Sequence, residues 1–242
     1  MIYLPSCHST NDIAAELVLK GLADEGTIVI TDNQVKGKGQ RGAEWYSEPS
    51  KNFTFSIILR PSFLSIAEQF LLSQTVALAI YNYVSLYSIE VKIKWPNDIY
   101  VSSKKISGTL IENSIQGTSL GHSIVGIGIN VNQTEFFNPK STSLANVLGH
   151  QLSLTSEFYK LVSLLDSGYL KLKSMQQADT IRNRYLSNLL GYNQLNSFKY
   201  KGELVGGTVT GITDSGKLCL KLNTENSVKE FDLKEIQWVF DV

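Results

Sequence analysis

The sequence has little of what marks several classes of protein. Its two cysteines, Cys7 and Cys219, lie far apart and match no zinc or redox spacing, so we expect ordinary reduced thiols. Lysine plus arginine and aspartate plus glutamate each number 22 in 242 residues, which disfavours binding to DNA or RNA through charge. No apolar run approaches the ~18 residues that span a bilayer, and Met1 to Pro5 is too short for a signal peptide. We therefore expect a cytoplasmic protein with no DNA partner and no membrane partner.

What the chain does contain is a long series of helix and strand signals. Apolar alternation and glycine or proline breaks predict strands at residues 1–4, ended by Pro5, at 27–31 and at 53–59. Residues 91–132 predict three or four further strands in an antiparallel meander. Apolar stripes at helical spacing predict helices that begin at Ser9 or Thr10 and that cover 70–84, 155–175 and 178–190.

The pattern changes near residue 196. From there on, short β-like runs alternate with Gly, Asn and Asp turns, and no helical period is present. The sequence therefore predicts an α+β core over residues 1–192, with a mixed and largely antiparallel sheet. It also predicts a small all-β domain over residues 193–242.

A glycine-rich loop follows the second predicted strand. Residues from Gly37 to Gly42 match G-x-G-x-x-G, but the dinucleotide motif of that form needs a helix at its last glycine, and here a strand follows. Glycines let backbone amides approach an anion closely, and Lys38 and Arg41 add positive charge. We interpret the loop as a cover for a phosphate-bearing ligand, with Trp45 as an apolar flap. A solvated loop whose glycines serve turns is the alternative.

Two polar features lie in the predicted meander. Asn97 and Asp98 follow a strand that Pro96 ends, and a carboxylate with an amide is what a hydrated Mg²⁺ or a nucleotide phosphate requires. Lys105 lies beside hydroxyl residues on the next strand and could neutralise charge that develops on a phosphoryl group. A tight reversal without chemistry and a solvated strand lysine are the alternatives.

Two glycines interrupt the last strand of the meander. Alternation places Gly126, Gly128 and Asn130 on one face, and a glycine inside a regular element costs about 0.5–1 kcal/mol. Two glycines on the same face indicate that a flat group, such as a purine ring, or another backbone lies against the bare strand. A bulge or close packing within the sheet explains the pattern as well.

Together these segments resemble the catalytic core of biotin–protein ligases, also called holocarboxylase synthetases. The resemblance covers about residues 1–190, and the β tail resembles the family's C-terminal domain in architecture. It rests on an ordered set of motifs: Ser9, Thr10 and Asn11; Gln34; Gly37 to Gly42 with Trp45; Lys94 to Asp98; Lys105 and Gly108; and Gly126 to Asn130. The resemblance implies a core like that of class II aminoacyl-tRNA synthetases, followed by an SH3-like β-barrel.

The resemblance also implies a role for each of these residues. Biotin would contact Ser9, Thr10, Asn11, Gln34, Lys38, Gly39 and Gly108. ATP would contact Gly37, Gln40, Gly42, Trp45, Asn97, Gly126, Gly128 and Asn130. The catalytic residues would be Lys105, Asp98 and Arg41, with Asp98 also beside the metal. The family usually carries arginine where Lys38 and Gln40 stand, and the loss of charge at Gln40 puts tight retention of the reactive intermediate in question.

The activity implied by the resemblance is ligation. The protein would use ATP and Mg²⁺ to convert biotin to biotinyl-5′-AMP and pass it to a lysine of a biotin carboxyl carrier protein domain. It would act as a monomer or a homodimer, without a DNA-binding domain, because the ligand motif already begins at Ser9. A lipoate–protein ligase is the nearest alternative. A non-catalytic module that binds a nucleotide or a protein is a second one.

Overall fold

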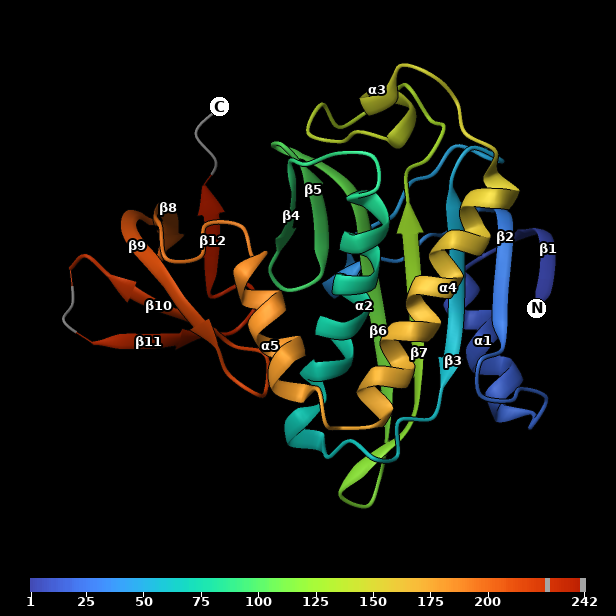
Figure 1. The fold of residues 1–242 in the computed structure, drawn as a ribbon, viewed down its shortest axis with the longest axis horizontal. Coiled ribbons are helices and arrows are strands. Elements are labelled where there is room, and N and C mark those ends of the chain that lie inside the picture. Colours follow the sequence, from blue (N-terminus) through green and yellow to red (C-terminus); the bar gives the residue numbers. More distant parts are fainter. Residues whose placement is uncertain (225–226, 240–242) are drawn as a thin grey trace.

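The computed structural model of the protein describes residues 1–224 and 227–239 and shows a large sheet with helices on its faces beside a smaller β unit (Figure 1). The seven strands of the large sheet are, in spatial order, β1 (Ile2–Cys7), β2 (Ile28–Gln34), β3 (Phe53–Leu59), β7 (Ser119–Ile129), β6 (Lys104–Gln116), β5 (Asp98–Val101) and β4 (Val91–Lys94). Only β1 and β2 pair in parallel, and the other neighbours are antiparallel. The predicted mixed, largely antiparallel sheet and its meander are confirmed.

Helices cover both faces of this sheet. The helices are α1 (Thr10–Leu19), α2 (Phe70–Val84), α3 (Leu144–Leu148), α4 (Leu154–Lys173) and α5 (Ala178–Ser187). Helices α2 and α4 lie side by side on one face (Figure 1), and α5 packs against α2. Helix α1 packs on β2, β3 and β7. It lies on the opposite face, because Ile58 of β3 joins its apolar cluster whereas Ile57, one residue earlier, joins the cluster of α2.

Strand β3, which lies next to the central strand β7, shows why the site lies where it does. The predicted alternation is confirmed, since Phe53, Phe55 and Ile57 enter the core under α2 and α4. All seven residues of β3 are nevertheless buried. The second face carries Thr54 and Ser56, whose burial is explained by the start of α1 and by the cavity described below.

Two details of the core differ from the sequence predictions. Strand β1 continues through Pro5 to Cys7, so the prediction that Pro5 ends it is wrong. Strand β1 is an edge strand, where a residue without an N–H donor is tolerated. Helix α5 ends at Ser187 rather than near residue 190, and the chain turns at Gly191 with a φ of +67°.

The smaller unit is an antiparallel five-stranded sheet. Its strands are β8 (Leu195–Tyr200), β9 (Glu203–Ile212), β10 (Leu218–Leu222), β11 (Val228–Phe231) and β12 (Ile236–Val239), in the spatial order β11-β10-β9-β8-β12. The short β runs predicted for this region are present as these strands. The indole N–H of Trp95, beside the large sheet, donates to the carbonyl of Gly216 at 2.8 Å and ties the two sheets together. No helix within the described residues has the length and apolar character needed to cross a membrane.

Candidate active site

A cavity of about 340 Å³ lies where the two sheets meet. Its walls come from the start of α1, the glycine-rich loop, the turn between β4 and β5, strands β6 and β7, and the small sheet. The sequence-predicted residues that line it are Ser9, Thr10, Asn11, Gln34, Lys38, Gly39, Gln40, Trp45, Asn97, Asp98, Lys105, Gly108, Gly126 and Gly128. Motifs up to about 120 residues apart in the chain therefore meet in one place.

Four predicted residues fall outside this lining. Gly37 and Gly42 shape the glycine-rich loop without facing the cavity. Asn130 is 4% exposed and donates its amide to the carbonyl of Thr142 at 3.0 Å, so it braces the backbone behind the site. The side chain of Arg41 lies outside what the structure describes.

One end of the cavity is a network of buried polar groups. The backbone N–H of Thr10 donates to Oε1 of Gln34 at 2.8 Å, which directs the amide NH₂ of Gln34 toward the loop at Gly37. The single hydroxyl of Ser56 lies within hydrogen-bond distance of both Thr10 Oγ1 and Asn11 Oδ1, at 2.7 and 2.6 Å. Such a network holds donors and acceptors in fixed directions, as recognition of a small polar ring requires.

Two members of this network were not predicted. Ser56 lies on β3 and is fully buried, and Glu112 of β6 accepts from Nδ2 of Asn11 at 2.6 Å. A serine within an apolar strand was the available signal for Ser56, because a buried hydroxyl needs a partner. Ser9 is the N-cap residue of α1 and has extended backbone, but its side chain makes no capping hydrogen bond.

The other end of the cavity carries charge. Lys105 Nζ lies 2.8 Å from Asp98 Oδ2, and the pair packs over Gly108, where a Cβ would come within 3.1 Å of both side chains. Asn97 is buried and donates to the carbonyl of Thr109, which fixes the turn that presents Asp98. Lys94 also lines this end. Burial lowers the pKa of the Lys94 ammonium, Asp98 opposes this, and Lys105 and Lys140 lower it further.

The donors here suit a metal ion that arrives with a phosphate ligand. The part of the chain that the structure describes contains no cluster of three or more His, Cys, Asp or Glu side chains that could hold a metal ion. Asp98 offers one carboxylate, already paired with Lys105. Because Mg²⁺ is commonly held by one or two carboxylates together with substrate phosphates, the site fits MgATP as a substrate rather than a resident ion.

The glycine-rich loop folds back on itself. Gln40–Gly42 form a single 3₁₀ turn, Gly39 N donates to Ala43 O at 2.6 Å, and Trp45 N donates to Gly37 O at 3.0 Å. A Cβ at Gly37 would lie 2.1 Å from the carbonyl oxygen of Trp45, so this closure needs glycine there. No α-helix follows Gly42 before β3, which agrees with the rejection of a dinucleotide motif.

Each of the two strand glycines leaves room for the side chain of another residue. At Gly128, a Cβ would lie 2.3–2.6 Å from three atoms of the Trp45 indole, so the flat group against this backbone is the protein's own ring. At Gly126, a Cβ would lie 2.4 Å from Asn11 Oδ1. Gly126 therefore lies beside the polar network, and its expected place on the adenine side of the cavity stays a prediction.

The small sheet supplies a wall that the sequence did not predict. The residues that contribute it are Phe198, Leu218, Leu233, Ile236, Gln237 and Trp238. Their alternation in short strands predicts only a small β core, and nothing local indicates which of them face another sheet. The second unit thus completes the cavity.

The chain is similar in sequence to known proteins. Residues 3–130 match the model of the biotin/lipoate A/B protein ligase family. The bifunctional ligase/repressor BirA of Bacillus subtilis is 30% identical over 229 residues, which cover 92% of this chain and 70% of that protein. A biotin–[acetyl-CoA-carboxylase] ligase of Paracoccus denitrificans is 36% identical over 126 residues, about 51% of each chain.

The fold gives the same result. The structure of a biotin protein ligase from Aquifex aeolicus in complex with biotin and ATP superimposes with a TM-score of 0.79 at 25% identity, and the match covers 98% of each chain. The match therefore includes the small sheet as well as the core. The family model spans more than half of the sequence, and the site motifs of the large sheet lie within it. The chain belongs to the biotin/lipoate A/B protein ligase family.

Proposed function

We propose that the protein is a biotin–protein ligase, which activates biotin with MgATP as biotinyl-5′-AMP and transfers it to a lysine of an acceptor protein. The observation that carries this proposal is the single cavity that joins a polar network around Thr10 and Gln34 to the Lys105–Asp98 pair. We propose a biotin carboxyl carrier domain as the acceptor, the cytoplasm as the place of reaction, and a monomer or homodimer as the working state.

The first step forms a mixed anhydride. A carboxylate oxygen of biotin attacks the α-phosphorus of ATP, the bond to the bridging oxygen breaks, and pyrophosphate leaves with that electron pair. Negative charge grows on the phosphoryl oxygens, and fixed cations and amides lower its energy. Lys105 and Lys94 line the cavity where this charge would form, and the loop amides from Gly37 to Gly42 and the Arg41 side chain are proposed to add to them.

The second step transfers the acyl group. The neutral amine of the acceptor lysine attacks the acyl carbon, an amide forms, and AMP leaves as the anhydride bond breaks. The neutral amine must lose one proton as the amide forms, and Asp98 is a carboxylate that lines the cavity beside Lys105. Since Asp98 is already paired with Lys105, we propose that it orients the incoming amine and accepts its proton as the pair loosens.

We propose biotin rather than lipoate as the substrate. The family description includes lipoate ligases, whose chemistry is the same, but the Paracoccus denitrificans relative and the Aquifex aeolicus structure named above are biotin ligases. The buried donors and acceptors around Thr10 and Ser56 also suit a ring with several hydrogen-bonding groups better than an apolar chain.

Isotope exchange between pyrophosphate and ATP tests the proposal. We expect exchange with biotin and little with lipoate, and then a mass increase of one biotin on a carrier domain, with release of AMP. Exchange with lipoate alone would make the protein a lipoate ligase. Binding of ATP with neither exchange nor AMP release would make it a non-catalytic module.

A further inference from the structure

Helix α5 directs one buried hydroxyl at the turn that presents Asp98. The phenol of Tyr185, which is fully buried, donates to the carbonyl oxygen of Pro96 at 2.7 Å. Pro96 belongs to the turn that joins β4 to β5, and Asp98 is the first residue of β5. The two reaction steps above give a task to Asp98 but none to Tyr185.

The hydroxyl of Tyr185 is held in its protonated form. Burial, and after it the Asp98 carboxylate, raise the pKa of this hydroxyl well above its ordinary value. Because Asp98 acts on this pKa, its carboxylate lies within electrostatic range of the phenol. A buried phenol that stays a donor holds the carbonyl of Pro96 in one fixed direction.

The small sheet holds the same turn from another side. The indole N–H of Trp95 donates to the carbonyl of Gly216 at 2.8 Å. Gly216 has a φ of +93°, and a Cβ there would come within 2.6 Å of the Phe70 ring. The Phe70 ring also packs edge-on against Tyr185, with the ring centroids 5.8 Å apart. The two residues that hold the turn, Tyr185 and Gly216, are therefore packed against the same ring.

The strand that leads into the turn is fixed as well. The N–H of Ile93 donates to the carbonyl of Asn188 at 3.0 Å, and the N–H of Leu190 donates to the carbonyl of Ile93 at 2.7 Å. The chain that leaves α5 thus pairs with β4, the last strand of the large sheet, between α2 and the small sheet (Figure 1). A shift of α5 would therefore move β4 and the turn together.

Beyond the turn, the position of Asp98 must be accurate. Asp98 Oδ2 lies 2.8 Å from Lys105 Nζ, and a Cβ at Gly108 would come within 3.1 Å of Asp98 Oδ1. Both charged side chains are partly exposed, so burial alone does not fix them. The backbone of the turn is then what sets the place of the carboxylate.

We propose that Tyr185 is a positioning residue, whose bond to Pro96 sets where Asp98 meets Lys105 and the incoming amine. The inference rests on the proposed function, because Asp98 has its task only if acyl transfer takes place. Loss of the hydroxyl should then slow the chemistry in a protein that still folds and binds biotin. The polar network around Thr10 lies at the other end of the cavity, so biotin binding does not depend on this turn.

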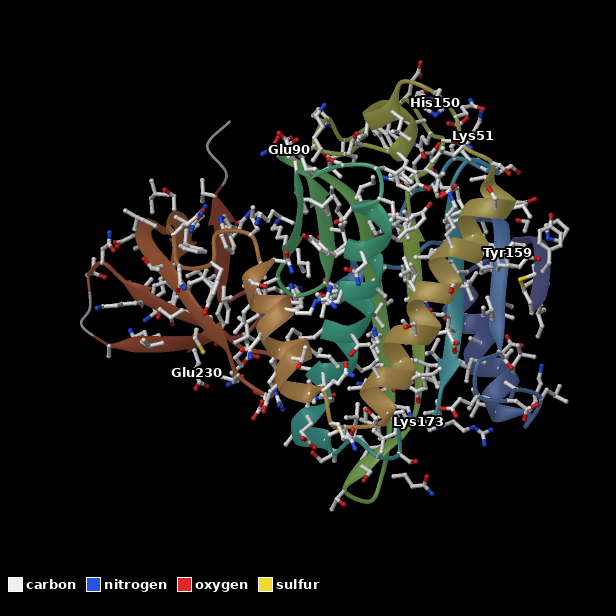
Figure 2. The ribbon with its side chains drawn as sticks, viewed as in Figure 1. Lys51, Glu90, His150, Tyr159, Lys173 and Glu230 are labelled. Carbon is white, nitrogen blue, oxygen red and sulfur yellow. The ribbon has the colours of Figure 1, made fainter. Side chains whose placement is uncertain are left out.

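The test removes one oxygen atom from each of two buried tyrosines. Tyr185→Phe keeps the ring and loses only the bond to Pro96. Tyr169→Phe is the matched control, because its hydroxyl donates at 2.7 Å to Glu25, which also binds Lys173, labelled in Figure 2 and away from the cavity lining. Parent and variants are compared in transfer to a carrier domain, in biotin-dependent exchange and in the Kd for biotin by calorimetry. All rates are taken at a temperature where thermal unfolding shows every protein folded.

The expected signature is a change in kcat without a change in biotin binding. The kcat for transfer should fall about 10- to 100-fold in Tyr185→Phe, since a displacement of about 1 Å near a reacting group can cost ~10²-fold. Exchange should fall too, because Lys105 is placed by the same ion pair. The KM and Kd for biotin should stay near those of the parent, and Tyr169→Phe should keep the parent kcat.

A second comparison asks whether Tyr185 acts through Asp98. In an Asp98→Asn background, Tyr185→Phe should cost little more, because two residues that work through one contact are not additive. A full further loss there overturns the inference, as does a parent-like kcat in Tyr185→Phe alone or an equal loss of kcat in the Tyr169→Phe control. Absence of biotin-dependent exchange in the parent is a different result, which would refute the proposed function and this inference with it.

Discussion

The indole ring of Trp45 occupies the space over Gly128 that any other residue would fill with its Cβ. The contact joins the glycine-rich loop to the centre of the large sheet, because Gly128 pairs with Thr54 of β3 and with Gly108 of β6. Lys105 Nζ lies 5.6 Å from the same ring. The loop, the strand glycine and the candidate catalytic lysine are therefore one packing unit, and a change at Gly128 should be felt in the use of ATP.

We predict that Gly128→Ala impairs nucleotide use more than biotin binding. The new Cβ would lie 2.3 Å from the indole, so Trp45 must move and the loop must open. The KM for ATP in the exchange assay should rise, while the Kd for biotin by calorimetry should change little. Gly211→Ala is the matched control, because a Cβ there meets nothing within 4 Å. Equal losses for both ligands would contradict the placement of the nucleotide near this strand.

Lys105→Ala should nearly abolish adenylate formation without unfolding the protein. Removing one donor that stabilises charge in a transition state commonly costs a factor of about 10²–10³. The Lys105 and Asp98 side chains are 31% and 23% exposed, so their ion pair contributes only about 0–1 kcal/mol to stability. Exchange kinetics and thermal unfolding give the two readouts.

The neighbouring lysine gives the control for that substitution. Lys104 begins β6, is exposed and does not line the cavity, so Lys104→Ala should leave exchange unchanged. If the Lys105→Ala variant exchanges pyrophosphate with ATP nearly as fast as the Lys104→Ala variant, Lys105 has no part in the mechanism.

Most of the fold was predictable because its elements carry strong periodic signals. Helix α2 covers residues 70–84 and β3 covers 53–59, as predicted, since long apolar stripes and runs leave few alternatives. The sequence did not predict helix α3, because its five residues are too few to show a helical period of apolar positions. It is instead defined by its ends, where Ser143 accepts from the N–H of Asn146 and Gly149 adopts a φ of +79°.

The candidate site was predictable as a set of motifs, but not as a set of contacts. Glycines in β7 indicated that something flat lies on the strand, yet only the folded chain shows that Trp45 lies there. The bond from Ser56 to Asn11 joins residues 45 positions apart, and no local pattern links them. The wall from the small sheet depends on how two units pack, which alternation within either unit does not describe.

Gln40→Arg is expected to hold the reactive intermediate more tightly. Gln40 lines the cavity beside Gly39 and carries no charge, so an arginine would add a guanidinium able to bind phosphate oxygens. The parent, with biotin and MgATP but without a carrier, should release biotinyl-5′-AMP that labels a bystander protein such as serum albumin. The variant should label the bystander more slowly while transfer to a carrier domain continues. Faster bystander labelling in the variant would show that residue 40 does not contact the intermediate.

Far from the site, a buried carboxylate links stability to pH. Glu157 of α4 is 3% exposed and accepts hydrogen bonds from Tyr83, Tyr87 and Lys160. Burial by itself raises the pKa of the Glu157 carboxyl, but the bonds from Lys160, Tyr87 and Tyr83 outweigh it, and the pKa falls below its ordinary value. Burial and the nearby carboxylate raise the pKa of Tyr83, so its hydroxyl stays a donor.

We therefore predict that Glu157→Gln lowers the free energy of unfolding by about 1.5–3 kcal/mol near pH 7, the range for hydrogen bonds to a charged group. Because the folded pKa is depressed, the carboxylate stabilises the fold above its unfolded pKa of about 4.3, and this contribution is lost as pH falls through the folded value. Urea unfolding at several pH values should show the difference between parent and variant shrinking below about pH 4. Glu16→Gln, at an exposed pair with Lys20, should cost little at any pH. A difference for Glu157→Gln that is constant from pH 7 to pH 3 would mean that packing, not the ionised carboxylate, stabilises this region.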